Sequence, residues 1–595
     1  MHLQNNQVNE PNIIDSNKDI IEINNHSSQE LLDSISNTSD EHEFYTPILK
    51  GYKVGKTKYI VVLGTVMSGL GKGIFSSSLG KLLQIKGLKV SPIKLEGYLN
   101  VDSGTLNPFR HGEVYVLDDG METDMDLGTY ERILNINLTK HNFSTNGQIL
   151  SSVFDRERKG QYLGRDVQFI PHVTGEVKKI IRSLAVESKA NVVVIEIGGT
   201  VGDIENMVYI EAMRELAYEE GKENICFVAL TYILEPRFLG EQKSKAAQLG
   251  IRSVLSAGIQ PNIVACRCHN PVTEKIKEKM SIFSNVPVNR VISLHDVSTV
   301  YKIPALLKES RIDEEVMKIL SLKQKTSLEE EQKDIEQIND YVKKLENPKH
   351  EITIGITGKY TNIRDSYASI LKALEHAGAA LETKVNVTWI ETTEIETGKI
   401  SVDKSMKGVD GIIVPGGFGK RGVEGKIKCV EHVRKNKIPF LGICYGLQIA
   451  LIEFARNVCK LEDVHTTEIK PNAKNPVICI LPEQLKIEGL GGNMRLGGRD
   501  VEVKLDSQAS KLYDNKTIIR ERFRHRFECN PEYIKTFEEK GIVFSGKAPN
   551  TNIMQILEMP SHPYFIGTQF HPEFTSRQFS PQPLFYGLVK ACLKK

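Results

Sequence analysis

An excess of either charge is missing from this 595-residue sequence, because 77 basic side chains are matched by 75 acidic ones. Near-neutrality excludes a global field that would recruit nucleic acid or an anionic membrane, so anionic ligands must be held by local basic clusters. No run of about 18 apolar residues is present, which excludes a membrane-spanning helix. The polar segment Met1–Glu10 lacks the apolar core of a secretory signal. Nine scattered cysteines without framework spacing indicate reduced thiols in a cytoplasmic protein.

Changes in composition divide the chain into four segments. Residues 1–57 are rich in Asn, Ser, Asp and Glu and poor in aromatics, which predicts a disordered polar tail. A chain of 595 residues is too long for a single hydrophobic core and must divide into domains. Residues 58–320 and 351–595 each have the length of one large domain. Residues 321–350 between them are rich in Lys and Glu, with apolar residues at helical spacing, and predict a helical linker.

Short apolar runs of strand type alternate with helical segments in both large segments. Such alternation predicts an α/β fold, with two doubly wound domains whose mainly parallel sheets are covered by helices on both faces. The runs on which this prediction rests are 59–63, 88–93, 192–197, 225–230, 263–265 and 352–356.

A cysteine stands where a strand-like run changes into a helical one. Residues 438–443 form the run, Cys444 follows it, and glycines at 442 and 446 allow a tight turn. The thiol is thereby presented at a helix N-terminus, where the helix dipole favours the thiolate that attacks carbon. This is the layout of a nucleophile elbow, carried by cysteine in place of serine.

The motif Gln569-Phe-His-Pro-Glu573 supplies a base for this thiol. His571 would take the thiol proton, and Glu573 would fix the tautomer of the imidazole. The glycine-rich loop 415–419 offers free amides, which predicts an oxyanion hole made by the N–H groups of Gly417 and Tyr445. Each motif alone is commonly structural, but their occurrence together in this order favours a catalytic triad.

The combination resembles class I glutamine amidotransferase domains. In those domains the thiolate attacks the side-chain amide of glutamine, ammonia leaves, and water hydrolyses the glutamyl thioester. The resemblance implies that the amino acid part of glutamine is held by Gln448, Glu468 and Arg526.

A glycine-rich segment, Ser68-Gly-Leu-Gly-Lys-Gly73, follows the first strand-like run and precedes a helical one. A strand-to-helix turn of this kind that ends in lysine predicts a phosphate-binding loop, with backbone amides and an ammonium group facing anionic oxygens. It is not a standard Walker A motif. Val66 stands where the first glycine would be, and Gly73 stands where a hydroxyl side chain would bind Mg²⁺.

Acidic side chains are expected beside this loop. Glu196 ends a buried strand-like run and precedes a glycine-rich loop, which places its carboxylate at the edge where doubly wound folds bind ligands. Asp124 and Asp126 are a second source of carboxylates, so we interpret the group as a Mg²⁺ site rather than as helix caps. Lys243 and Lys245 form a further basic cluster, which from the residues alone is equally consistent with a ligand contact and with a solvated surface pair.

Ammonia released by a cysteine triad needs an activated acceptor. A phosphate-binding half would supply one by phosphorylating an oxygen that ammonia then displaces. From the residues alone the prediction stops at ATP-dependent amination of an unidentified oxo or carboxyl group.

From Lys58 to about Cys592 the chain resembles the CTP synthase family. The motifs that carry the resemblance, besides the phosphate loop and the triad, are His111-Gly-Glu-Val114, Asp119–Gly128, Glu196–Glu205 and Gly491–Gly497. The resemblance implies that ATP phosphorylates O4 of UTP, that ammonia replaces this phosphate, and that CTP forms with Mg²⁺ as the metal. It also implies a ligase with glutamine as nitrogen donor.

The resemblance further assigns residues to ligands. It implies ATP contacts from Ser68, Gly69, Leu70, Gly71, Lys72, Gly73, Lys94, Arg267 and Asp296, and UTP or CTP contacts from Ser68, Asp203, Glu205, Lys243, Lys245, Gln248 and Lys279. Asp126 and Glu196 would bind Mg²⁺. GTP would activate glutamine hydrolysis near Phe418–Glu424, ammonia would pass near His111 and Val114, CTP would inhibit by feedback, and the chain would form a homotetramer, a dimer of dimers that could extend into filaments.

Four segments depart from the family pattern. The chain has Lys243-Ser-Lys-Ala-Ala-Gln248 in place of Lys-Thr-Lys-Pro-Thr-Gln, Glu96-Gly97 in place of Asp-Pro, Thr65 in place of Gly, and Tyr445 in place of Leu. These departures put UTP affinity and feedback inhibition in doubt. Two alternatives therefore stay open: another P-loop glutamine-dependent amidotransferase, and a non-catalytic filament-forming paralogue. The lysines expected to bind ATP, the carboxylates expected to bind Mg²⁺ and the triad are all present. We therefore expect an active enzyme with altered kinetics.

Overall fold

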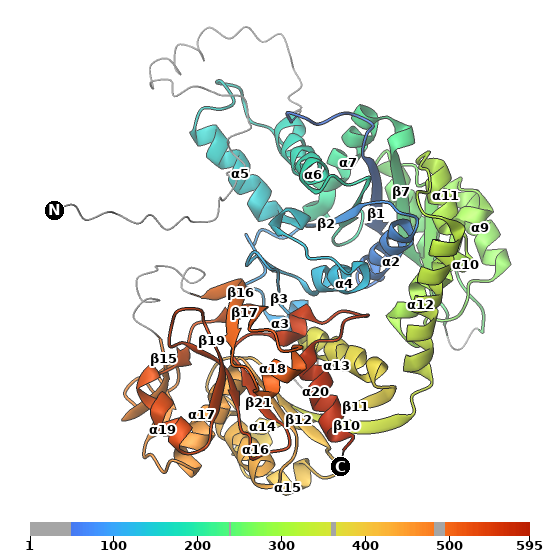
Figure 1. The fold of residues 1–595 in the computed structure, drawn as a ribbon. Coiled ribbons are helices and arrows are strands. Elements are labelled where there is room, and N and C mark those ends of the chain that lie inside the picture. Colours follow the sequence, from blue (N-terminus) through green and yellow to red (C-terminus); the bar gives the residue numbers. More distant parts are fainter. Residues whose placement is uncertain (1–48, 237–239, 359–363, 481–493, 595) are drawn as a thin grey trace.

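The computed structural model describes residues 49–236, 240–358, 364–480 and 494–594. Two α/β units, each built on a large sheet, lie one above the other in Figure 1, and the long helix α12 (Leu328–Glu346) runs along one side between them. The predicted fold class is confirmed. The prediction for the tail can be compared with the structure only over residues 49–57, since residues 1–48 lie outside the described residues.

The first unit contains a seven-stranded sheet of order β5-β2-β6-β1-β7-β8-β9, in which every neighbouring pair is parallel. Its central strands are buried on both faces, which explains their continuous apolar sequences. The strands are β1 (Lys58–Gly64), β2 (Val90–Glu96), β5 (Phe143–Thr145), β6 (Val192–Ile197), β7 (Ile225–Tyr232), β8 (Ile263–Arg267) and β9 (Val291–Leu294). A short hairpin, β3 (Tyr115–Val116) with β4 (Glu122–Thr123), lies beside the second unit.

Helices connect these strands and cover the sheet. They are α2 (Lys72–Ile85), α3 (Pro108–His111), α4 (Met125–Leu134), α5 (Asn146–Arg158), α6 (Thr174–Ser188), α7 (Met207–Glu220), α8 (Lys245–Ser256), α9 (Glu274–Ser284), α10 (Ile303–Glu309) and α11 (Ile312–Ile319). The linker helix α12 begins at a capping box formed by Ser327 and Glu330. Its apolar residues pack on both units: Ile338 contacts the core of the first sheet, and Val342 joins a small cluster with Ala379 of the second unit.

The second unit contains a nine-stranded sheet of order β11-β10-β12-β13-β21-β20-β19-β16-β17. The pairs from β11 to β21 are parallel, whereas those from β21 to β17 are antiparallel, an extension that the alternation of runs did not reveal. The strands are β10 (His350–Gly358), β11 (Thr383–Glu391), β12 (Gly411–Val414), β13 (Phe440–Ile443), β16 (Arg495–Val503), β17 (Ile518–His525), β19 (Val543–Lys547), β20 (Met554–Glu558) and β21 (Phe565–Thr568).

The remaining elements of the second unit complete its two faces. A small sheet joins β14 (Val464–Thr466), β15 (Asn475–Cys479) and β18 (Glu528–Cys529). The helices are α13 (Ala368–Ala380), α14 (Thr392–Glu396), α15 (Val402–Ser405), α16 (Val423–Lys435), α17 (Tyr445–Asn457), α18 (Gln508–Leu512), α19 (Ile534–Glu539) and α20 (Pro583–Cys592).

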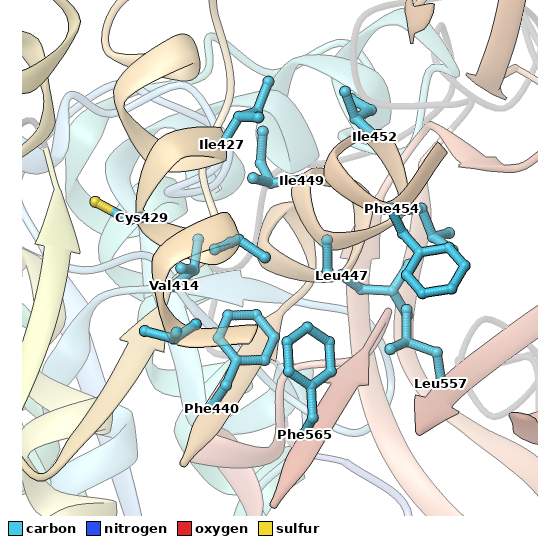
Figure 2. Close-up of a cluster of buried hydrophobic side chains, with 14 of the residues drawn as sticks. Val414, Ile427, Cys429, Phe440, Leu447, Ile449, Ile452, Phe454, Leu557 and Phe565 are labelled. Carbon is cyan, nitrogen blue, oxygen red and sulfur yellow. The ribbon is translucent and has the colours of Figure 1, made fainter. Parts of the chain in front are cut away.

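The core beneath the predicted elbow is apolar and closely packed. Figure 2 shows Phe440 of β13 beside Phe565 of β21, with Leu447 of α17 above them. The two phenylalanine rings stack with centroids 4.4 Å apart. This packing fixes the end of β13, and with it the start of α17, against the sheet.

Residues 49–57, at the end of the predicted tail, already contact the first unit. The Tyr52 and Tyr59 hydroxyls lie 2.6 Å apart, and the Arg182 guanidinium lies over the Tyr52 ring at 5.2 Å from its centroid. The Gly55 amide donates to Glu220 Oε2 at 3.1 Å. Polar composition concealed this order, because the contacts come from one aromatic side chain, one threonine hydroxyl and one backbone amide.

The elbow has no room for a side chain at Gly446. A Cβ atom there would lie 2.1 Å from the carbonyl oxygen of Val414, a backbone atom that cannot turn away. We expect Gly446→Ala to destabilise the second unit by about 3 kcal/mol, the upper range for overpacking. The measurement is thermal unfolding together with glutamine-dependent activity.

Gly408→Ala is the matched control for this prediction. Gly408 belongs to the same unit and has open space around it, so only its positive φ of 77° opposes the substitution, at a cost of about 1 kcal/mol. Equal shifts in melting temperature for the two variants would contradict the packing argument.

Candidate active sites

The first site is built around Cys444, which directly follows β13 and caps α17. Its backbone has φ 51° and ψ −98°, a conformation that side chains rarely adopt and that turns the chain sharply. The Cys444 amide donates to the carbonyl of Thr568 at 2.6 Å, which holds the elbow against β21. The thiol side chain is buried, with 6% of the residue exposed. The predicted nucleophile elbow is therefore present in the structure.

His571 and Glu573 lie beside this thiol. The Nδ1 atom of His571 lies 2.7 Å from Glu573 Oε1, and the imidazole stacks on the Phe574 ring at 5.1 Å. Gly416 brings the base and the nucleophile together, since a Cβ there would lie 2.8 Å from His571 Cε1 and 3.6 Å from Cys444 Cβ. The structure thus brings the three predicted catalytic residues into one place.

The charge state of His571 follows from these neighbours. Burial works to lower the pKa of the imidazole, but the Glu573 carboxylate and the Cys444 sulfur outweigh it and raise this pKa to about 10. The imidazole is therefore positively charged at neutral pH and can act as a proton donor. In this arrangement Glu573 orients the ring and stabilises its positive charge.

A glutamine side chain that sequence reasoning missed lies over the nucleophile. Gln569 Nε2 donates to Cys444 Sγ at 3.5 Å, and Gln448 Nε2 donates to Gln569 Oε1 at 3.3 Å and to the carbonyl of Phe527 at 2.9 Å. The signal was available, because Gln569 opens the motif that contains His571. Gln448, predicted to hold glutamine, is thereby connected to the thiol through Gln569.

The other predicted glutamine contacts surround the same elbow. The Gly419 amide donates to Glu468 Oε1 at 2.8 Å, which joins Glu468 to the loop that carries Gly417. Arg526 lies directly after β17, the strand whose Arg524 carbonyl is 3.7 Å from the Cys444 sulfur. Tyr445 is buried, its ring lies under the Lys426 ammonium at 5.2 Å, and its hydroxyl has no hydrogen-bond partner among the described residues.

The second site begins with the predicted phosphate loop between β1 and α2. Val66, Gly69 and Gly71 all have positive φ, of 72°, 75° and 82°. Val66 thus adopts the glycine-like backbone of the position at which Walker A loops have glycine, although a β-branched residue is strained there. Lys72 opens α2, and its ammonium donates to the carbonyl of Gly199 at 2.8 Å, while burial lowers its pKa.

The Lys94 ammonium lies among the carboxylates that were predicted to bind Mg²⁺. The parallel register of β2 and β6 pairs Lys94 with Glu196, whose carboxylate is 3.8 Å from the ammonium. Asp126 contacts the same ammonium, and Asp124 and Glu96 lie 2.7 and 3.1 Å from it. Burial opposes the charge, but these four carboxylates hold the pKa of Lys94 well above its usual value.

The carboxyl groups around Lys94 differ in their pKa values. Burial raises the pKa of Glu196 to about 7 and that of Glu96 to about 8. Asp126 is also buried, yet Lys94 and then Lys72 keep the pKa of its carboxyl below the ordinary value. Asp126 therefore remains anionic, whereas Glu196 is close to the midpoint between its neutral and charged forms at neutral pH.

The carboxylates of Asp126 and Glu196 are the kind of oxygen ligand that a magnesium ion prefers. Their oxygens already converge on one cation, the Lys94 ammonium. A Cβ atom at Gly73 would lie 2.9 Å from Asp126 Oδ1, so the carboxylate takes the room of the hydroxyl that a Walker A loop would place there. Within the described ranges no group of three or more His, Cys, Asp or Glu side chains is arranged to hold a metal.

Two cavities share Arg267 and Asp296, and the smaller of them adjoins the phosphate loop. One of about 170 Å³ is lined by Leu70 and Gly71 of the loop and by Arg267 and Asp296, whose side chains form an ion pair. A larger one of about 1090 Å³ contains the predicted nucleotide residues Lys243, Lys245, Gln248 and Lys279, together with Arg267 and Asp296. The structure thus groups these six predicted residues.

Asp203 and Glu205 are not among the residues that line the larger cavity. They follow β6, and Asp203 Oδ2 accepts hydrogen bonds from the Thr200 amide and hydroxyl, both at 2.8 Å. Apart from Ser68 in the phosphate loop, the predicted UTP contacts therefore fall into two groups on one chain: one follows β6, and the other lines the larger cavity.

Two departures from the family pattern are accommodated by glycines. Thr65 donates to the carbonyl of Leu230, and a Cβ at Gly250 would lie 2.6 Å from its hydroxyl, so Gly250 provides the space for this side chain. Likewise, a Cβ at Gly198 would lie 2.6 Å from Glu96 Oε2. The absence of a side chain at Gly198 therefore leaves room for the longer side chain of Glu96, whose carboxylate forms an ion pair with Lys94.

A Cys-His-Glu site on one α/β unit and a phosphate loop with buried lysines and acids on the other define a glutamine amidotransferase joined to a nucleotide-dependent part. Two family models match the chain: CTP synthase N-terminus over residues 58–322 and glutamine amidotransferase class-I over residues 362–591. The chain belongs to the CTP synthase family.

Similar curated proteins extend over almost the whole chain. CTP synthase of Methanopyrus kandleri is 46% identical over 534 residues, which are 90% of this chain and 98% of that protein. The proteins of Pyrococcus abyssi and Carboxydothermus hydrogenoformans are 48% and 47% identical, over 90% of this chain and 98% and 99% of theirs. Among the described residues, no helix has the length and apolar character needed to cross a membrane.

The raised pKa of His571 leads to a test of the triad. Glu573→Gln removes the carboxylate that favours the imidazolium, so the pKa of His571 falls and its proton is lost at lower pH. We expect the alkaline limb of the glutaminase pH profile to move to lower pH and the maximal rate to fall by roughly 10²-fold or more. The measurement is glutamate release as a function of pH.

Glu539→Gln is the control, because Glu539 is an exposed carboxylate at the end of α19. An unchanged alkaline limb in Glu573→Gln would contradict the assignment of Glu573 as the group that sets the charge of His571.

Proposed function

We propose that this chain makes CTP from UTP in a ligase reaction that forms a C–N bond, with ATP as co-substrate and glutamine as nitrogen donor. The observation that carries this function is the presence of both half-sites on one chain of the CTP synthase family. The elbow with Cys444 and His571 releases ammonia, and the loop with Lys72 and Lys94 activates the acceptor.

In the glutaminase half, the Cys444 thiolate attacks the side-chain amide of glutamine. The N–H groups of Gly417 and Tyr445 stabilise the oxyanion, and the His571 imidazolium donates its proton to the leaving ammonia. His571 then takes a proton from the water that hydrolyses the thioester. Gln448, Glu468 and Arg526 hold the amino acid part of the substrate.

In the other half, ATP lies along the phosphate loop with its base in the smaller cavity, between Leu70 and Arg267. Lys72 and Lys94 neutralise the phosphates, and the γ-phosphoryl group is transferred to O4 of UTP. Ammonia then attacks C4, and O4 leaves with the phosphoryl group as inorganic phosphate. UTP occupies the larger cavity with Lys243, Lys245, Gln248 and Lys279. Asp126 and Glu196 would hold Mg²⁺, which would neutralise phosphate charge.

Ammonia passes between the halves near the segment His111–Val114. Support comes from contacts of this segment with the second unit: the Glu113 amide donates to the carbonyl of Asp365 at 3.0 Å, and the Ser369 amide donates to Glu113 Oε2 at 2.9 Å. Val114 is buried beside them. The passage therefore begins where the two units already touch.

The domain limits 58–320 and 351–595, joined by the helical linker 321–350, fit this division of labour, with residues 1–57 as a polar tail. GTP acts as activator near Phe418–Glu424 and CTP as feedback inhibitor. The enzyme is a cytoplasmic homotetramer, which the division of the UTP residues into two groups supports, because a second copy would complete the site. Ile204 and Met207, beside Asp203, are exposed apolar side chains available for such a contact.

The alternatives of another amidotransferase and of a non-catalytic paralogue are less well supported. The N-terminal model that matches is that of CTP synthases, and the triad, both lysines and both metal acids lie in two assembled sites. A test for CTP formed from UTP, ATP, Mg²⁺ and glutamine, with and without GTP, should show turnover that GTP increases. Absence of CTP would contradict the proposed function.

Mutations in the two half-sites should affect glutamine-dependent and ammonium-dependent CTP formation differently. Cys444→Ala removes the nucleophile, so glutamine-dependent CTP formation should fall to background while ammonium-dependent formation persists. Lys72→Ala leaves the phosphates without their buried ammonium, so synthesis should stop with either nitrogen source. Product formation measured with glutamine and with ammonium salts distinguishes the two.

Cys459→Ala is the control for the thiol, because Cys459 is a half-buried cysteine that lies after the end of α17. Equal loss of both activities in Cys444→Ala would contradict two separate sites.

A further inference from the structure

A buried ion cluster joins the two units close to the glutaminase triad. Glu131 of α4 belongs to the first unit and is fully buried, and it receives two hydrogen bonds from Arg522 of β17 in the second unit, at 2.7 and 3.0 Å. Arg577, also of the second unit, donates to Glu131 Oε2 at 2.8 Å. One carboxylate therefore holds two guanidinium groups across the interface, away from water.

Tyr115 of the first unit belongs to the same cluster. Its hydroxyl lies 2.5 Å from Glu131 Oε2 and 2.8 Å from the carbonyl oxygen of Phe574. Its ring packs edge-on against the Phe574 ring at 5.0 Å. Arg577 also donates to the Phe574 carbonyl, at 2.9 Å. Phe574 is thus held by side chains from both units.

Two short connections lead from this cluster to the catalytic base. The carbonyl of Arg522 accepts a hydrogen bond from the backbone amide of His571 at 2.8 Å. The Phe574 ring stacks on the His571 imidazole at an interplanar angle of 12°. The backbone and the ring plane of the base are therefore both set by residues that Glu131 holds in place.

The helix that carries Glu131 also carries a residue of the other site. Asp126 lies in the first turn of α4, where its carboxylate contacts Lys94, and Glu131 lies little more than one turn further along. Residues five apart on one helix cannot move independently by much, because their separation is fixed by the helix geometry. One helix thus joins the predicted nucleotide site to the carboxylate that contacts Arg522 and Arg577.

We propose that Glu131 is a positioning residue for glutamine hydrolysis, which sets the catalytic base His571 from the opposite unit through Arg522, Arg577 and Phe574. The inference rests on the proposed function and deepens it. The glutaminase is fully assembled only when the nucleotide-binding unit is docked against it. Glu131 touches neither glutamine nor the thiol, so its effect is exerted through the geometry of His571.

The charge of Glu131 is needed for this arrangement. Burial alone would raise its pKa, but Arg522 and Arg577 outweigh burial and keep the pKa of this carboxyl below its usual value. A neutral amide in its place would leave two buried guanidinium groups without their anion, and one of them would have to move to find another partner.

Glu131→Gln tests the proposal in the full-length enzyme. We expect the glutaminase kcat to fall by roughly 10²-fold, the scale for a catalytic group displaced by about 1 Å. The KM for glutamine should change by less than about twofold, because Gln448 and Glu468 are not touched. Ammonium-dependent CTP formation should remain at the wild-type rate. Glutamate release and CTP formation are measured separately, so a failure of the proposed function would leave the glutaminase test intact.

Asp118→Asn is the matched control. Asp118 also forms an ion pair across the interface, with Arg520 at 2.9 Å, but this pair is partly exposed and adjoins neither Phe574 nor the amide of His571. It should leave both activities unchanged. An equal loss of the two activities in Glu131→Gln, or the same selective loss in Asp118→Asn, would overturn the proposal.

Tyr115→Phe is the second variant, in case Glu131→Gln does not fold. It keeps the ring against Phe574 and removes only the hydroxyl that joins Glu131 to the Phe574 carbonyl. The same selective loss of glutaminase kcat, about fivefold or more for one buried hydrogen bond, is expected. Wild-type glutaminase activity in Tyr115→Phe, or a fall in melting temperature with no change in the ratio of the two activities, would refute the positioning role.

Discussion

Neighbouring parallel strands end at the same edge of a sheet, and both active sites depend on this geometry. In the first unit the register of β2 and β6 pairs Lys94 with Glu196, which creates the charged group beside the phosphate loop. In the second unit Ile443 of β13 pairs with Thr568 of β21. Cys444 and His571 follow these two strand ends within three residues, so the register alone brings the nucleophile near its base.

Glycines then decide how closely the functional groups approach. Gly416 admits the His571 ring beside the thiol, and Gly73 admits the Asp126 carboxylate at the phosphate loop. Gly250 has the same role for the unusual Thr65. At each of these positions a methyl group would occupy the place of an atom that the site uses. The glycines therefore act here as space for other side chains, whereas at Gly69 and Gly71 they allow a positive φ.

Much of this was predictable from sequence because it is local. The elbow at Cys444, the position of Glu196 near the end of β6 and the linker helix each leave a pattern within one continuous stretch of sequence. The antiparallel extension from β20 to β17 was not predictable, and neither was the position of Lys94 among the predicted carboxylates, since both depend on pairings between distant segments. Arg522 shows the limit most clearly: it lies four residues before Arg526, which the sequence does single out, but its partner Glu131 is 391 residues away.

The linker helix α12 connects the source of ammonia covalently to its consumer, which affects how the cell uses nitrogen. Because one polypeptide carries both half-reactions, the producer and the consumer of ammonia are made in equal numbers at every level of gene expression. Neither can be diluted away from the other, since a covalent tether keeps the local concentration of each catalytic half high near its partner. Free ammonia is volatile and is claimed by many reactions, and a tethered source reserves it for a single product.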